Sequence, residues 1–354
     1  MNKGKIVTGK VRNLKLSEPI LYIDNGARGR SGHMGHPMLN LGNGRIMDFN
    51  SNVSAVRCDG HSGFGWMEYR MSEDNGDTFG EFNVVPYTKE ILLDGIYSAI
   101  IEAAVVCDDG AIVAFCNIFS QENSVCCNPY GIPTYIRSCD QGKTWEEAKP
   151  LSSYEGRVYN ARYYDGKIYV LEFCNREVAG KTDSDLYRIF QSCDNGKSFE
   201  ELCVVPFHST KGRFYGTMQF DMIGNLIVYA YNQDCENELD YAISKDCGKT
   251  WSKTGACFLA KKIRNPQIAI LDGQFILHGR EAWDVNAFVL YTSEDGIVWD
   301  EGHRIVDYHP AISFYSNNVL VNKNGKNKLL VQYSQTYKES CCVNIYHMWI
   351  EHEA

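Results

Sequence analysis

One eight-residue motif recurs along the chain and constrains its fold more than any other feature. The pattern is Ser-x-Asp-x-Gly-x-[Thr/Ser]-[Trp/Phe], and clear copies begin at Ser72, Ser138, Ser192 and Ser244. A fifth, less regular copy spans residues 292–299, with Glu294 where the aspartate is expected. The motif glycines lie 66, 54, 52 and 48 residues apart. A period of this size is typical of the blades of a β-propeller.

A second series of signals, six two-residue turns, has the same period. The turns are Asn43-Gly44, Asp109-Gly110, Asp165-Gly166, Gly224-Asn225, Asp272-Gly273 and Asn324-Gly325. Each lies between short runs rich in Val, Ile, Leu and Tyr, as expected for a β-hairpin whose turn needs positive φ. Between each of the first five turns and its motif there is room for one more strand, and another follows the motif. Each unit is therefore predicted to be a four-stranded antiparallel meander.

The sixth unit begins near Ser313, and the chain ends at Ala354, where its motif and outer strand would come. Residues 18–23, Glu-Pro-Ile-Leu-Tyr-Ile, precede the first hairpin and have no partner in their own unit. We expect this segment to supply the missing strand and so close a ring. The prediction is an all-β chain, a six-bladed β-propeller that forms a single domain over residues 1–354, with almost no regular helix.

Composition excludes several kinds of partner. Lys and Arg total 35 against 44 Asp and Glu, a net charge of −9, and no basic cluster suits a phosphate backbone, so nucleic acid is not expected to bind. No run of about 18 apolar residues and no signal-peptide core occurs, which predicts a cytoplasmic protein without membrane contact. The 14 cysteines include no Cys-x-x-Cys pair. We therefore expect mostly free thiols, no metal site and no cofactor.

The motif itself has a structural explanation. Its aspartate can accept backbone amide bonds across the turn, its glycine supplies a positive φ, and its aromatic residue can pack between neighbouring sheets. In a meander the hairpins and the motifs lie on one rim of the ring. Functional residues are therefore expected on the opposite rim, at the starts of the innermost strands and in the loops between second and third strands.

Repeated at this period, the motif resembles the Asp-box of the sialidase (neuraminidase) superfamily, and the resemblance covers essentially the whole chain. It implies a glycan-binding site and a nucleophilic tyrosine. The segment 314–320, Phe-Tyr-Ser-Asn-Asn-Val-Leu, is similar to the segment that holds that tyrosine, and Tyr315 is the best match. By position, Asp59 in the long loop of blade one matches the family's acid/base aspartate.

The chain departs from the family's three-arginine clamp for the substrate carboxylate. Gly35-His36-Pro37 stands where the first arginine is expected, and Tyr231-Asn232 stands where the second is expected. The glutamate that should deprotonate the tyrosine falls near Tyr215-Gly216. Arg280 in blade five is placed as the third arginine or a substitute. One cation replaces a clamp of three, so a substrate other than sialic acid is expected.

A tyrosine nucleophile needs a neighbouring base, because its ordinary pKa is near 10. Glu102 and Glu172 are the candidates, since each interrupts an apolar run that would reach the axis. Either carboxylate has the alternative role of a buried salt-bridge partner. The expected catalytic residues are Tyr315, Asp59 and Glu102, and the expected substrate-binding residues are Arg280, His36, Glu172, Arg162 and Gln267.

Three functions remain open. The first is an exo-acting glycoside hydrolase that removes a terminal sugar from oligosaccharides. The second is a propeller that binds glycans without cleaving them, which would explain the missing arginines and glutamate. The third is a uronate-directed polysaccharide lyase that uses His36 and Tyr315, with Arg280 on the carboxylate. All three have a carbohydrate as partner.

Overall fold

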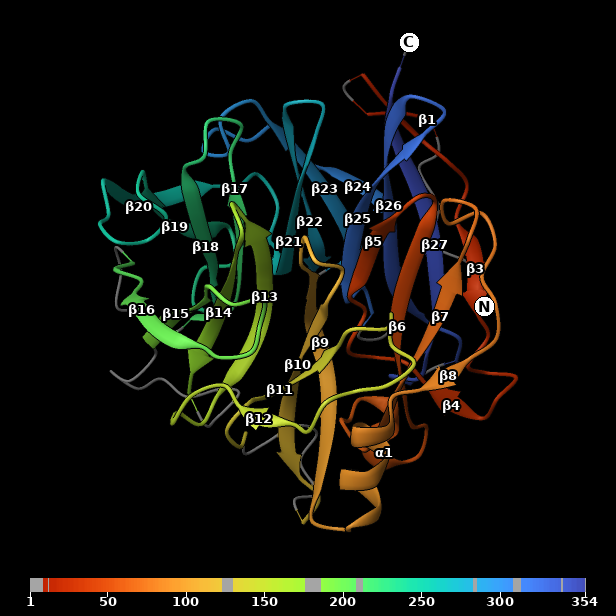
Figure 1. Ribbon diagram of the computed structural model, residues 1–354. Coiled ribbons are helices and arrows are strands. Elements are labelled where there is room, and N and C mark those ends of the chain that lie inside the picture. The colour runs from red at the N-terminus through yellow and green to blue at the C-terminus, as the bar shows by residue number, and fades with distance from the viewer. Residues whose placement is uncertain are drawn as a thin grey trace.

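The computed structural model describes residues 9–11, 13–122, 130–175, 186–207, 213–282, 285–307, 313–338 and 340–353. Its strands form six antiparallel sheets that follow one another around a common axis (Figure 1). The predicted all-β fold, a six-bladed β-propeller of four-stranded antiparallel sheets, is confirmed.

The strands of each blade run from the axis outward in chain order. Blade one contains β5 (Met38–Gly42), β6 (Arg45–Ser54), β7 (Gly65–Ser72) and β8 (Asn83–Val84), with β4 (Arg30–Ser31) beside β6. Blade two contains β9 (Tyr97–Val106), β10 (Ile112–Ser120), β11 (Thr134–Ser138) and β12 (Lys149–Pro150). Blade three contains β13 (Arg157–Tyr164), β14 (Lys167–Cys174), β15 (Leu186–Ser192) and β16 (Glu200–Val204).

The second half of the ring repeats this order. Blade four contains β17 (Arg213–Phe220), β18 (Leu226–Asn232), β19 (Glu238–Ser244) and β20 (Lys253–Phe258). Blade five contains β21 (Arg264–Leu271), β22 (Gln274–Glu281), β23 (Ala287–Ser293) and β24 (His303–Val306). Blade six contains β25 (Ser316–Lys323), β26 (Lys326–Thr336) and β27 (Val343–His352). The innermost strands β5, β9, β13, β17, β21 and β25 contact one another in this order, and β25 contacts β5.

The amino-terminal segment completes the last blade. Strand β3 (Ile20–Ile23) pairs with β27, with Leu21 opposite Tyr346. Strand β2 (Leu14–Leu16) continues along β27, with Leu14 opposite His352, and β1 (Gly9–Val11) pairs with β2. In Figure 1 the red β3 lies beside the blue β27. The amino-terminal strands and the last strand are thus joined by backbone hydrogen bonds, which cover the outer edge of β27.

The repeated motif is a hydrogen-bonded turn. In the fourth copy, the amide of Thr250 donates to Asp246 Oδ1 at 2.8 Å, and its hydroxyl donates to Oδ2 at 2.6 Å. The amide of Gly248 donates to Ser244 Oγ at 2.7 Å. The hydrogen bonds that Asp246 itself accepts, led by that of the Thr250 hydroxyl, lower its pKa to about 2. The motif therefore closes its turn with an ionised aspartate, as expected for a structural role.

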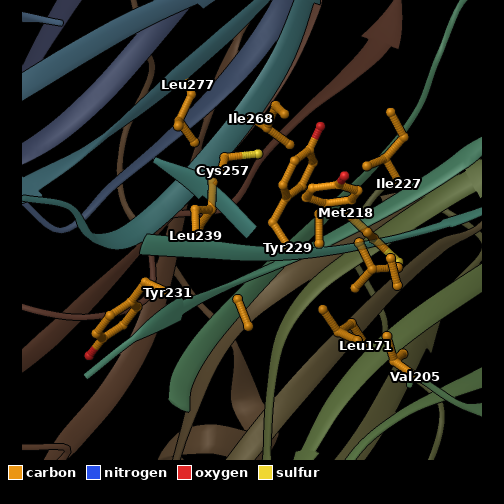
Figure 2. Packing of buried hydrophobic residues seen from close by; sticks show 14 of the residues in the cluster. Leu171, Val205, Met218, Ile227, Tyr229, Tyr231, Leu239, Cys257, Ile268 and Leu277 are labelled. Atoms are coloured by element: carbon orange, nitrogen blue, oxygen red, sulfur yellow. The ribbon is translucent and has the colours of Figure 1, made fainter. Parts of the chain in front are cut away.

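The motif's aromatic side chain packs against the preceding blade. Phe199 of blade three lies with its ring centroid 5.5 Å from that of Phe115 in blade two. Trp299 of blade five lies 6.4 Å from Tyr229 of blade four. Figure 2 shows Tyr229 close to Met218 and Ile268, within an apolar cluster formed by blades three, four and five. The motif thus joins each turn to the interface between sheets.

The fifth copy of the motif differs from the sequence alignment by one residue. Ser293 and Asp295, rather than Thr292 and Glu294, make the turn's hydrogen bonds. The amide of Gly296 donates to Ser293 Oγ at 2.9 Å, three residues away instead of four. The expectation that Glu294 takes the aspartate's place is therefore wrong, because this turn is one residue shorter and uses the following aspartate.

Two short helices interrupt the meander. Helix α1 (Pro86–Leu93) connects blade one to blade two, and the Met67 amide donates to Thr88 Oγ1 at 2.9 Å. The 3-10 helix η1 (Arg57–Gly60) lies in the loop between β6 and β7. Within the described residues, no helix has the length and apolarity needed to cross a membrane.

Candidate active site

A pocket opens on the axis of the ring, where the innermost strands of several blades begin. Its lining comes from blades one, two, three, five and six, and consists of Gly35, His36, Glu102, Tyr159, Gln267, Tyr315, Ser316 and Asn317. Four of these residues, His36, Glu102, Gln267 and Tyr315, are the ones that the sequence analysis selects. Residues far apart in the chain meet here because each of these five blades contributes residues from its inner strand or from the segment just before it.

Tyr315 is held at the pocket by an unusual backbone conformation. The preceding residue, Phe314, has a φ of 67°, which is rare for a bulky side chain and is retained only where the surroundings enforce it. Its amide donates to the carbonyl of Ser334 at 2.7 Å, and the amide of Tyr315 donates to Ser334 Oγ at 3.1 Å. The Phe314 ring is fully buried. This turn directs the Tyr315 side chain toward the axis.

Arg280 faces Tyr315 from the end of β22. Its guanidinium carbon lies 5.3 Å from the centroid of the Tyr315 ring, and only 5% of the residue is exposed. Two of its nitrogens, Nε and Nη1, have no hydrogen-bond partner among the described residues. A buried cation with unused donors is costly for the folded state. An anionic ligand would supply the missing acceptors.

Two histidines contact Tyr315, and a third, His36, lines the same pocket. His61 Nε2 lies 3.4 Å from the Tyr315 hydroxyl oxygen. The ring of His33 packs edge-on against both, with centroids 4.2 Å from His61 and 4.6 Å from Tyr315. Burial, followed by the charges of Arg280 and Arg157, lowers the pKa of His61 to about 3. Burial also lowers the pKa of His36 to about 4. All of these imidazoles are therefore neutral at physiological pH.

A buried ion pair supports the wall of the pocket. Arg157 donates from Nε and Nη2 to the two carboxylate oxygens of Glu102, and Asn117 Nδ2 donates to Glu102 Oε2 at 2.8 Å. The remaining nitrogen, Nη1, donates to the hydroxyls of Tyr130 and Tyr215, each at 2.7 Å. Burial by itself would lower the pKa of Arg157, but the Glu102 carboxylate raises it well above its ordinary value. Arg157 therefore keeps its charge in this buried position.

A second arginine near the site, Arg264 of blade five, is also paired with a carboxylate. Arg264 lies opposite Arg280 in the β21–β22 register and forms an ion pair with Glu236. Its guanidinium carbon lies 5.9 Å from the Tyr231 ring. The rings of Tyr159 and Tyr215 stack on each other, with their centroids 4.4 Å apart. The site thus combines aromatic rings, two paired arginines and the guanidinium of Arg280, whose Nε and Nη1 have no hydrogen-bond partner among the described residues.

Comparison with known proteins identifies the architecture. No protein-family profile and no curated sequence matches the chain. Among solved structures, a protein of unknown function from Dyadobacter fermentans superposes with a TM-score of 0.75 at 14% identity, over 97% of this chain and 100% of that one. A variant of the NanB sialidase from Streptococcus pneumoniae superposes with a TM-score of 0.66 at 11% identity, over 94% and 70%. The Ruminococcus gnavus intramolecular trans-sialidase gives 0.64 at 11% identity, over 94% and 97%. The chain has a sialidase-like fold.

In this sialidase-like propeller, four of the residues selected from the sequence are not part of the pocket lining: Arg280, which lies over the Tyr315 ring, and Asp59, Glu172 and Arg162. Asp59 is exposed on η1, and its carbonyl accepts a hydrogen bond from the Cys341 amide at 3.0 Å. Glu172 is buried in β14, where Ser152 Oγ donates to its Oε1 at 3.3 Å. Arg162 extends from β13 to the carbonyl of Ile268 at 3.0 Å, next to the contact between Asn160 and Gln267. Arg162 therefore bridges the innermost strands of blades three and five.

Other residues at the site were not selected from the sequence. Arg157 and Tyr215 lie at innermost-strand starts, and their position is the signal that would have nominated them. His61 follows η1, and the sequence offers only its nearness to Asp59 as a clue. The contact between His61 and Tyr315 joins blade one to blade six, so it depends on closure of the ring.

Proposed function

We propose that the chain is a sialidase-like exo-glycoside hydrolase that removes a terminal sugar with a carboxylate group, bound in the axial pocket. One observation carries the proposal: the buried guanidinium of Arg280 has donors without a partner among the described residues and lies over the Tyr315 ring, 5.3 Å from its centroid. A carboxylate on Arg280 would place the adjoining anomeric carbon near the Tyr315 hydroxyl. Charge-assisted bonds of this kind are the strong ones in ligand recognition.

The other groups at the pocket suit a sugar. Both ring nitrogens of His36 lack partners among the described residues, and Gln267 and Asn317 contribute amides to the lining. Tyr159 contributes an aromatic ring to the lining. Hydroxyl groups of a sugar can satisfy the polar side chains while its apolar face packs on an aromatic ring. A carbohydrate ligand is therefore part of the proposal.

In the proposed reaction, the Tyr315 oxygen attacks the anomeric carbon, and the bond to the leaving oxygen breaks with its electron pair going to that oxygen. Asp59 is the proposed acid that protonates the leaving group. A water molecule, which gives its proton to the Asp59 carboxylate, then attacks the anomeric carbon, and the bond from that carbon to the tyrosine oxygen breaks, which releases the sugar. A tyrosine nucleophile is an established exception to the use of two carboxylates in glycoside hydrolysis.

Sialic acid is not the proposed sugar. Arg157 is paired with Glu102, and Arg264 is paired with Glu236, so two of the three cations near Tyr315 already have carboxylate partners. A ligand carboxylate would gain its charge-assisted bonds mainly from Arg280. We therefore propose a uronic acid or a similar sugar acid as the terminal residue.

A panel of aryl glycosides tests this function. The panel contains 4-nitrophenyl uronides, neutral 4-nitrophenyl glycosides and an aryl sialoside, and release of the phenol is measured for the wild type and for Tyr315→Phe. The expected result is turnover of a uronide above the sialoside, with loss of turnover in the variant. Binding of the sugars without release of phenol would instead support a glycan-binding propeller. Efficient turnover of the sialoside would contradict the proposed substrate.

A second candidate is a uronate-directed lyase, and one observation favours it. Both carboxylate oxygens of Glu102 accept hydrogen bonds from Arg157. The neutral imidazole of His61 and the guanidinium of Arg280 both lie next to Tyr315. An elimination needs a base for the proton next to the carboxylate, an acid for the leaving oxygen and a cation on the carboxylate. Oligouronides incubated with the protein would then yield an unsaturated product with new ultraviolet absorbance, which hydrolysis does not produce.

A further inference from the structure

We infer that His61 accepts the proton of the Tyr315 hydroxyl, and that an anionic group of the ligand on Arg280 is what permits this transfer. The inference rests on the proposed function and identifies the base that the reaction needs. In the transfer, the O–H bond of Tyr315 breaks and an N–H bond forms at His61 Nε2. The electron pair left on the phenolate oxygen is the one that attacks the sugar, and the imidazolium returns its proton when the tyrosyl bond breaks.

The geometry selects His61 among the neighbouring groups. Its Nε2 is 3.4 Å from the Tyr315 oxygen, a distance that a modest closure on ligand binding would shorten to an ordinary hydrogen bond. Glu102 would first have to leave Arg157, and Glu236 is held by Arg264. His33 contacts Tyr315 through its ring edge.

His61 follows η1, a segment with a strained backbone that packs closely against Cys342. Two consecutive non-glycine residues before His61, Cys58 and Asp59, have φ angles of 48° and 53°, and Gly60 follows with 88°. A side chain at Gly60 would meet Cys342, since a Cβ there would lie 2.6 Å from its Sγ and 2.8 Å from its Cα. The Cys342 thiol also donates to the carbonyl of Ala55 at 3.1 Å. Strain of this kind persists only where the surroundings over-determine the backbone, and it gathers at functional sites.

Charge explains why the ligand is needed. Burial is the largest factor that opposes protonation of the His61 imidazole, and the positive charges of Arg280 and Arg157 oppose it further. Glu102 neutralises Arg157, whereas the donors Nε and Nη1 of Arg280 have no partner among the described residues. A ligand carboxylate on Arg280 would cancel the nearest uncompensated positive charge. Protonation of the imidazole then becomes easier, so the base would work only when substrate is present.

Rescue by free imidazole tests the assignment. The probe is 4-nitrophenyl β-D-glucuronide, whose leaving group needs little acid catalysis. We expect His61→Ala to lower kcat by about 10² to 10³, within the usual range for a general base. Added imidazole should restore at least part of the rate in His61→Ala. It should restore none in His61→Gln, in which the cavity stays filled, or in the double variant His61→Ala/Tyr315→Phe. His303→Ala, on the outer strand of blade five, is the matched control and should keep the wild-type kcat.

The pH profile tests the role of the ligand. In the wild type, the acidic limb of kcat, which reports the bound enzyme, should lie at higher pH than the acidic limb of kcat/KM, which reports the free enzyme. In Arg280→Gln the two limbs should coincide. Limbs that coincide in the wild type would overturn the role of the ligand.

The outcomes separate this inference from the proposed function. If Tyr315→Phe loses turnover while His61→Ala, folded by circular dichroism, keeps it, the hydrolase proposal stands and the assignment of His61 fails. A slow His61→Ala that imidazole does not rescue would also overturn the assignment, since it would mark His61 as structural. If the wild type cleaves none of the aryl uronides, both the proposed function and this inference fail.

Discussion

Glu102 of blade two and Arg157 of blade three form an ion pair under the axial pocket in which both carboxylate oxygens accept from the same guanidinium. Glu102 is 5% exposed and Arg157 is 1% exposed. The pair joins β9 to the start of β13, and the remaining guanidinium nitrogen reaches Tyr130 and Tyr215. The pocket wall therefore depends on one buried charge pair.

Removal of one partner should destabilise the whole ring. Glu102→Gln leaves Arg157 buried without its counter-ion, and we expect a loss of about 3–5 kcal/mol in the free energy of unfolding. Urea denaturation measures it. Glu146→Gln, which breaks the more exposed pair with Arg137, is the control and should cost about 1 kcal/mol or less. Equal losses in the two variants would contradict a supporting role for the buried pair.

Arg280→Gln should weaken ligand binding and yet stabilise the unliganded protein. The variant removes a buried cation whose Nε and Nη1 have no described partner, so we expect a higher Tm. Loss of charge-assisted bonds should weaken binding of D-glucuronate at least 10-fold, measured by calorimetry. Arg45→Gln, on the opposite rim, should leave affinity unchanged. A lower Tm together with unchanged affinity would identify Arg280 as a structural residue.

Asp59→Asn should slow the enzyme in a way that depends on the leaving group. An acid matters most when the leaving oxygen is strongly basic, so hydrolysis of an alkyl uronide should fall by about 10² or more. Hydrolysis of 4-nitrophenyl β-D-glucuronide should change much less. Rates for a series of aryl and alkyl uronides measure this dependence. A uniform loss across the series would exclude Asp59 as the acid.

The amino-terminal strands should be required for the stability of the ring. Leu16 is 4% exposed in β2, whereas Ile20 is 60% exposed in β3. Leu16→Ala should therefore cost about 2–5 kcal/mol, and Ile20→Ala should cost little. Deletion of residues 1–24 should lower the Tm further, because β27 would become a free sheet edge. Thermal melting of the deletion variant at the wild-type Tm would refute closure by this segment.

Glu172→Gln should stabilise the protein at high pH. Burial raises the pKa of Glu172 from 4.5 to about 7. The folded state thus favours the neutral carboxyl, and ionisation costs it stability as pH rises from 4.5 toward 7. The full cost above pH 7 is about 3 kcal/mol. The variant's Tm should exceed the wild type's at pH 8.5, and the difference should shrink at pH 5. Glu200→Gln, exposed on β16, should show no such dependence.

The blade count could be predicted from the sequence because it depends on local signals. A positive φ at Gly44, or an aspartate that closes a turn at Asp246, is a property of a few neighbouring residues. The residue pattern does not predict the hydrogen bonds of the turn at Glu294, because the spacing of the motif changes there. The turn there is one residue shorter, so Asp295 makes the bonds.

The candidate site was only partly predictable. Tyr315, Arg280, His36 and Gln267 could be selected because each lies at a recognisable place within its own blade. Asp59 was selected by position alone, whereas the structure brings the imidazole of His61 to Tyr315. Glu102 was selected as a carboxylate in an apolar run, but the partner that engages it, Arg157, lies in the next blade.

By itself the sequence determined the number of blades, the strand order within each blade and the rim on which the turns lie. These follow from hydrogen bonds and side-chain alternation between residues close in the chain. Only the tertiary structure decided which side chains meet on the axis, that Arg157 and Arg264 are already paired, and that two nitrogens of Arg280 have no partner among the described residues. Those contacts join residues of different blades, such as His61 with Tyr315, so they are created by closure of the ring and leave no spacing in the sequence.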